Sequence, residues 1–100
     1  MLSVDMFSPD DIAKALARRV KRRRLDMNLT QQGVAKRSGV TLASVKRFEQ
    51  TGLVSLESLI RIAFVIDGAD ELSSLFQPKE FKTIKDVIGT ARTRERGTLK

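Results

Sequence analysis

Apolar residues along the chain recur at three- and four-residue spacing, which is the period of an amphipathic α-helix. With the local start and stop signals, this spacing predicts helices over residues 9–25, 30–37, 41–50, 55–67 and 69–76. The first helix begins after Ser8, an N-cap, and its apolar stripe runs from Ile12 to Leu25. No run of alternating β-branched residues indicates a strand. The pattern therefore predicts an all-α fold.

The next three helices are expected to begin in the same way. Each has a capping hydroxyl residue flanked by two apolar residues that contact each other. The caps are Thr30, Thr41 and Ser55. Gly39 and Gly68 stand where helices are expected to end, at the left-handed position that glycine occupies at little cost. Three such starts in succession predict short helices that cross at defined angles around one core.

Pro78 divides the chain into two parts. Residues 9–77 are expected to form the folded domain, and residues 78–100 a basic C-terminal tail. In the tail, apolar residues at positions 81, 84, 87 and 88 are spaced for a short amphipathic segment. The last ten residues are basic and nearly without apolar side chains. We expect residues 78–100 to be partly disordered, or to bind a partner or a second copy of the chain.

Residues 30–49 carry the spacing of a helix-turn-helix, two short helices around a turn at 38–40. Ala35 is small where the second helix must cross closely, and Gly39 permits the tight corner. The residues expected to face inward are Val34, Val40, Val45 and Phe48. A purely structural helical hairpin does not require the small residue four positions before the glycine. We therefore predict a DNA-binding unit that presents its second helix to the major groove.

The charge distribution indicates that this small helical domain is suited to bind a polyanion. The net charge is +7, with +4 in residues 1–24, −1 in residues 25–78 and +4 in residues 79–100. Basic ends on a near-neutral body favour nucleic acid as a partner. The chain has no cysteine and no histidine, which excludes thiol nucleophiles, imidazole bases and the usual zinc ligands. We expect no enzymatic activity, no cofactor and no metal.

Hydropathy favours a cytoplasmic protein. The N-terminus is acidic and lacks an apolar run, so no secretory leader is expected. The longest apolar stretch, residues 62–66, is far too short to cross a bilayer. With no cysteine available for disulfides, the chain is expected in a reducing cytosol, associated with the nucleoid through DNA.

Positions on the second helix of the unit predict the residues that read bases. Arg47 is the strongest candidate, because its guanidinium fork matches guanine O6 and N7. Leu42 and Ala43 can contact thymine methyl groups, and the hydroxyl residues add polar contacts. The predicted base-reading residues are Thr41, Leu42, Ala43, Ser44 and Arg47.

A second group is expected to bind DNA phosphates. Gln31 and Gln32 open the helix before the turn, where free backbone N–H groups and the helix dipole favour an anion. The cations expected to face phosphates are Lys21 and Arg22 in the first helix and Lys46 in the recognition helix.

Several of these stretches together resemble the Cro/C1-type, or xenobiotic-response-element-like, helix-turn-helix regulators. The matching stretches are residues 19–24, 29–32, the trio Ala35, Gly39 and Val45, and residues 48–49 and 55–56. The resemblance covers about residues 15–76 and implies a five-helix, lambda-repressor-like domain that binds an operator as a homodimer and represses transcription. It also implies that Arg24 pairs with Glu49, and that Gln31 clamps the DNA backbone.

Within that family, the series from Leu29 to Leu59 and the tail are similar to the antitoxin partners of HipA-type kinases. This similarity implies repression of the protein's own operon and binding to a HipA-like kinase toxin. A free-standing phage or chromosomal regulator is the alternative. A different class is a partner-binding module whose basic ends bind RNA or membranes. RNA reading favours exposed aromatic residues, and most of the five phenylalanines are expected to be buried.

Overall fold

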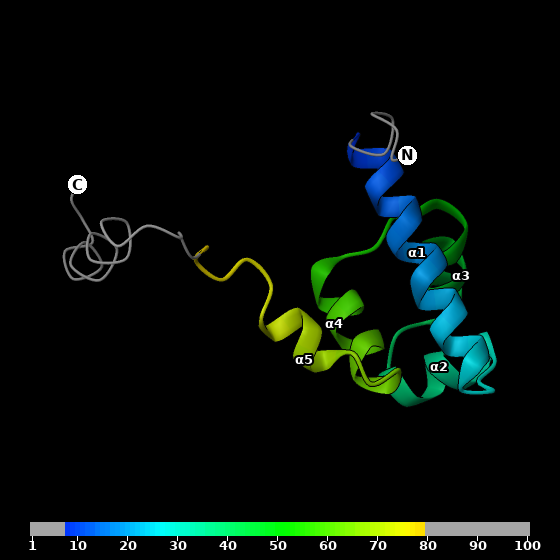
Figure 1. Cartoon of the computed structure of the whole chain (residues 1–100). Coiled ribbons are helices and arrows are strands. Elements are labelled where there is room, and N and C mark those ends of the chain that lie inside the picture. The colour runs from blue at the N-terminus through cyan, green and yellow to red at the C-terminus, as the bar shows by residue number, and fades with distance from the viewer. Residues whose placement is uncertain (1–7, 80–100) are drawn as a thin grey trace, which may run out of the picture.

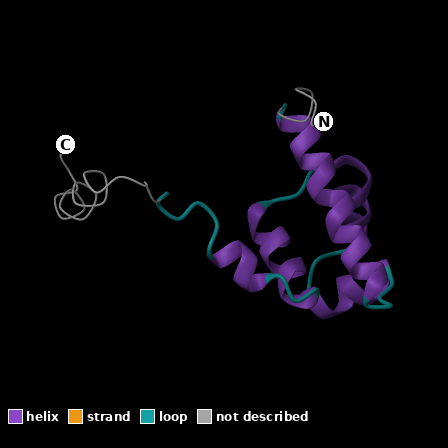
Figure 2. Cartoon of the chain, in the orientation of Figure 1, coloured by secondary structure: helices purple, strands orange, loops and turns teal. Residues whose placement is uncertain are grey.

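A computed structural model describes residues 8–79, which form five α-helices and no strand (Figures 1 and 2). The helices are α1 (Pro9–Asp26), α2 (Gln31–Ser38), α3 (Leu42–Thr51), α4 (Leu56–Val65) and α5 (Ala69–Ser73). The predicted all-α fold is confirmed. The amphipathic segment expected near residues 81–88 and the basic end of the chain lie outside the described residues.

Local capping explains where four of the helices begin. Ser8 Oγ accepts a hydrogen bond from the backbone N–H of Asp11 at 3.0 Å, which satisfies a free donor of the first turn. The predicted caps Thr30, Thr41 and Ser55 accept in the same way from the N–H three residues on. These starts are confirmed, because a cap needs only residues close in sequence. α5 has no side-chain cap.

The helix ends follow the prediction less closely. Gly39 ends α2 in the left-handed conformation, with φ of +81°, as expected. The same expectation for Gly68 is wrong, because its φ is −118° and the neighbouring Asp67 takes the positive φ of 62° instead. A Cβ at Gly68 would lie 3.2 Å from Arg23 Nη1, which is the far end of a flexible side chain. α4 ends at Val65 and α5 at Ser73, both earlier than predicted.

The core lies between α3 and the helices around it. Figure 1 shows α1 crossing α3, and α3 and α4 both contact α2. The four most completely buried large side chains are Val34, Val45, Phe48 and Ile62, each 1% exposed. Three of these, together with Val40, were predicted to face inward, and all four predicted residues are buried. The core therefore holds α2 and α3 in one fixed arrangement.

Some apolar residues expected in the core are exposed instead. Ile12 and Leu25 lie at the ends of the predicted α1 stripe and are 52% and 50% exposed. The buried face of α1 is narrower than predicted, and it includes Ala17 and Val20. The expectation that most phenylalanines are buried is also wrong for the described residues. Phe64 and Phe76 are exposed, because Phe64 lies on the solvent side of α4 and Phe76 follows α5.

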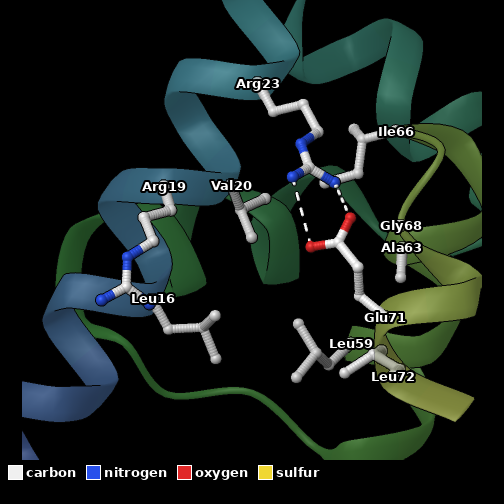
Figure 3. Close-up of a pocket in the computed structure, with 10 residues that line it drawn as sticks. All are labelled: Leu16, Arg19, Val20, Arg23, Leu59, Ala63, Ile66, Gly68, Glu71 and Leu72. Carbon is white, nitrogen blue, oxygen red and sulfur yellow. Dashed lines mark hydrogen bonds and ion pairs between the residues drawn. The ribbon is translucent and has the colours of Figure 1, made fainter. Parts of the chain in front are cut away.

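α5 is held to α1 by an ion pair between Arg23 and Glu71 (Figure 3). Glu71 Oε2 accepts from Arg23 Nη1, and the hydrogen bond from Arg23 lowers the pKa of the Glu71 carboxyl. The contribution of the pair to stability is therefore present at neutral pH and lost as pH falls through that lowered pKa. The pair borders a mostly apolar hollow of about 140 Å³ between α1, α4 and α5.

None of the helices within residues 8–79 combines the length and the apolar character that crossing a membrane requires. The same part of the chain contains no cluster of side chains that is suited to hold a metal ion.

Candidate nucleic-acid interface

The turn between α2 and α3 is fixed by hydrogen bonds from its own residues. Gly39 N–H donates to the carbonyl of Ala35 at 3.0 Å, closing the last turn of α2. Val40 N–H donates to Ser38 Oγ at 3.1 Å, so the buried Ser38 hydroxyl has a partner. Val40 is itself buried in the core against which α3 packs. The direction of α3 relative to α2 is therefore set by the turn and by packing together.

α3 has one buried face and one open face. Val45 and Phe48 are 1% exposed and point into the core. Ala43, Lys46 and Arg47 are exposed on the other face. The predicted base-reading residues thus fall into two groups. Thr41, Ala43 and Arg47 are exposed, whereas Leu42 and Ser44 are half-buried.

Two of the predicted base-reading hydroxyls are bonded to each other. Thr41 Oγ1 accepts from the backbone N–H of Ser44 at 3.1 Å and donates to Ser44 Oγ at 3.0 Å. The Thr41 hydroxyl therefore has both a donor and an acceptor in the cap of α3. Both hydroxyls therefore stabilise the first turn of α3.

A hollow beside Arg47 adds a part of the surface that sequence reasoning missed. Its volume is about 410 Å³, and its lining residues are Ser44, Arg47, Leu53, Val54, Ser55 and Ser58. Ser55 caps α4, so the hollow lies between the open face of α3 and the positive end of the α4 dipole. The cap at Ser55 was visible in the sequence. Its proximity to Arg47 was not, because it depends on the path of the loop at 52–55 that joins α3 to α4.

The free cations differ in part from those predicted. Among residues 8–79, no carboxylate lies within ion-pairing distance of Lys21, Lys46 or Arg47. Arg22, in contrast, donates to Asp26 Oδ1 at 3.1 Å, so an acid one turn away already compensates its charge. Lys21 and Arg22 belong to α1 and do not line the hollow beside Arg47.

Two further cations, which the predicted phosphate group did not include, lie at the end of α2. Lys36 and Arg37 are exposed, and neither forms an ion pair within the described part of the chain. Their charge was visible in the sequence. The lack of an acid three or four residues away was visible too, whereas the lack of a pairing acid from another described helix was decided by the fold.

A buried polar cluster joins the helix-turn-helix to α1. Arg24 Nε and Nη2 donate to the two carboxylate oxygens of Glu49 at 2.7 and 3.0 Å, and Arg24 Nη1 donates to the carbonyl of Leu29 at 2.8 Å. The side chains of Arg24 and Glu49 are only 7% and 4% exposed. The ion pair that the resemblance implied is thus present in the structure. It connects the end of α1, the loop before α2 and the last turns of α3.

The first two residues of α2 have different surroundings. Gln31 is half-buried, and its Nε2 donates to Glu49 Oε1 at 2.9 Å. Its side chain therefore extends the buried cluster, where a carboxylate oxygen has room for a further donor. Gln32 is exposed at the start of α2, beside the free backbone N–H groups of the first turn. Of the two glutamines predicted to bind phosphate, Gln32 has the more available side chain.

These observations define an all-α protein in which α2 and α3 pack around a tight turn, with exposed cations on the outer face of α3. Comparisons with family models, with curated proteins and with solved structures found no match for this chain. The similarity to the Cro/C1-type regulators therefore stays a prediction from the sequence motifs.

Proposed function

We propose that this protein binds double-stranded DNA sequence-specifically and regulates transcription, as a repressor that acts as a homodimer in the cytoplasm. The observation that carries the proposal is the open face of α3, where Arg47 and Lys46 are exposed without a neighbouring carboxylate in the described chain. A helix that binds DNA needs cations whose charge is not already neutralised by an acid of the protein. A palindromic operator with half-sites about 10 base pairs apart would present one turn of groove to each copy.

In this proposal α3 enters the major groove, and its residues make different kinds of contact with the DNA. Arg47 donates its two parallel N–H groups to O6 and N7 of one guanine. Ala43 is small and exposed, so a thymine methyl group can approach it. Lys46 contacts a phosphate at the groove edge, where a charge gives affinity without sequence preference.

The hollow beside Arg47 supports the same orientation. A backbone phosphate that follows the base pair read by Arg47 would lie close to the first turn of α4. Ser55 and Ser58 line this hollow, and the free N–H groups at the start of α4 favour an anion. The α2 start, with Gln32 exposed, offers a second position of the same kind. Two helix starts that each bind a phosphate would hold α3 in register on the duplex.

Selection from a random duplex library, followed by binding measurements, tests this proposal. We expect Arg47→Ala to weaken binding to the selected site by about 10- to 100-fold, since a bidentate guanine contact is worth about 1–3 kcal/mol. Binding to random duplex should fall much less. Lys21→Ala, a cation on α1, is the matched control and should weaken both complexes equally. Retained discrimination in Arg47→Ala would contradict the proposed reading contact.

The same assay separates the alternative nucleic acids. Competitor duplex DNA, single-stranded DNA and RNA of one length are titrated against the selected complex. We expect only duplex DNA that contains the site to compete at low concentration, and the affinity to fall steeply as salt rises. Preferential competition by RNA would reject the duplex-DNA proposal.

A further inference from the structure

The hollow between α1, α4 and α5 is lined mostly by aliphatic side chains. Leu16 and Val20 line it from α1, Leu59 and Ala63 from α4, and Leu72 from α5 (Figure 3). Its volume is about 140 Å³, and an apolar cavity of about 150 Å³ admits one benzene ring. A helix of a partner protein, about 10 Å across, is too wide for it. The hollow therefore has the size and the lining for one small apolar ring.

Charged groups border this hollow at two separate places. On one side Arg23 and Glu71 pair, so their opposite charges compensate each other. Arg19 also lines the hollow, and its guanidinium lies apart from that pair in Figure 3. Arg19 is exposed, and within residues 8–79 no carboxylate lies within ion-pairing distance of it. The net charge around the hollow is therefore positive, and Arg19 is the group with hydrogen bonds to donate.

α5 forms a wall of the hollow that is held only weakly. It has no buried residue and no side-chain cap. It packs on α4, and the pair between Arg23 and Glu71 joins it to α1. Both side chains of this pair are largely exposed, and exposed ion pairs contribute little to stability. A small shift of α5 therefore costs little free energy, and the hollow can adjust its width to a ligand.

We propose that this hollow binds a small carboxylate that carries one apolar ring. The ring lies among the aliphatic side chains, and the carboxylate accepts hydrogen bonds from the guanidinium of Arg19, whose fork matches its two oxygens. An apolar lining with a few polar groups that fix orientation is typical of small-molecule sites. None of the lining residues belongs to α2 or α3, so the ligand leaves the open face of α3 free. The site is thus a further one, beyond the proposed DNA interface.

The charges select an acid over a base as the ligand. A cationic ring would place its charge near Arg19 and Arg23, and Glu71 already accepts two hydrogen bonds from Arg23. A carboxylate without a ring would pair with Arg19 but would bury no apolar surface, which is the larger part of the lining. Both parts of the ligand are therefore needed for binding, and each can be removed separately in a probe.

Titration of the full-length protein with three probes, followed by NMR without DNA, tests the proposal. Benzoate has the ring and the carboxylate, benzylamine has the ring with a positive charge, and acetate has the carboxylate without the ring. We expect benzoate to bind at least about 10-fold more tightly than either of the others. Its ring protons should show nuclear Overhauser contacts to the methyl groups of Leu16, Leu59 and Leu72. Equal binding of benzylamine or acetate, ring contacts only elsewhere, or no saturation by ~10 mM benzoate would overturn the proposal.

Arg19→Gln provides the second measurement. We expect it to raise the benzoate dissociation constant by about 10-fold or more, because a hydrogen bond between charged groups is lost. Arg18→Gln removes the neighbouring exposed cation of α1, which does not line the hollow, and should leave the constant unchanged. Equal effects of the two variants would assign the attraction to the general charge of α1 and overturn the proposal. Because DNA is absent, any of these results leaves the DNA-binding proposal standing, whereas benzoate binding by a protein that ignores DNA sequence would reject only that proposal.

Discussion

Replacing Glu49 with alanine is expected to lower the free energy of unfolding by about 3–5 kcal/mol, a large part of what a small domain has. The substitution leaves the guanidinium of Arg24 buried with one remaining acceptor, the carbonyl of Leu29. A buried cation without its carboxylate costs far more than the ion pair itself contributes. Urea denaturation followed by circular dichroism measures the change, and the purified protein should already be partly unfolded near 37 °C.

The matched control for this prediction is Glu57→Ala. Glu57 also pairs with an arginine, but the pair is exposed on α4, and exposed pairs contribute only about 0–1 kcal/mol. A double variant, Arg24→Met with Glu49→Leu, removes both buried charges and should recover much of the lost stability. If Glu49→Ala and Glu57→Ala destabilised the chain equally, the buried cluster would not have the structural role described above.

The cluster also connects stability with DNA binding. Glu49 accepts hydrogen bonds from both Arg24 and Gln31, so it holds the first residue of α2 against the end of α3. Loss of Glu49 therefore releases the start of α2, one of the two helix starts proposed to hold phosphates. The acid acts on DNA binding through these neighbours, without touching DNA itself.

Replacing Gly52 with alanine is expected to cost about 2–5 kcal/mol, from two separate causes. Gly52 ends α3 with φ of +83°, a conformation that costs about 1–2 kcal/mol for a residue with a side chain. A Cβ at this position would also lie 2.9 Å from the backbone carbonyl carbon of Ala13 in α1. Backbone atoms cannot move aside as a flexible side chain can, and overpacking of this kind adds about 1–3 kcal/mol.

Gly39→Ala separates the two causes. Gly39 has almost the same φ, +81°, but the nearest atom to its Cβ would be Arg61 Nη1 at 3.5 Å, an ordinary contact. Its substitution should therefore show the conformational cost alone, about 1–2 kcal/mol. Both changes are glycine to alanine, so their effects on the unfolded chain are similar. Thermal or urea unfolding of the two variants side by side is the measurement, and equal losses would contradict the close approach of α1 to Gly52.

Features that depend on neighbouring residues could be predicted from the sequence. The four capped helix starts and the left-handed end of α2 at Gly39 are of this kind, because a cap or a tight corner is built within three or four residues. The inward positions of Val45 and Phe48 followed from helical spacing for the same reason. Local order was therefore sufficient to predict α2, α3 and the turn between them.

Features that depend on long-range packing were decided by the tertiary structure alone. The pairing of Arg23 with Glu71 joins positions 48 residues apart, and no local spacing points to it. The exposure of Phe64 and Leu25 likewise depends on which helix covers which face, since an apolar side chain has the same periodicity whether or not a neighbour lies over it. Contact across the fold also placed Gly52 against Ala13 of α1. Sequence period defines a helix and its faces, whereas only the packing of helices determines which face remains open to bind.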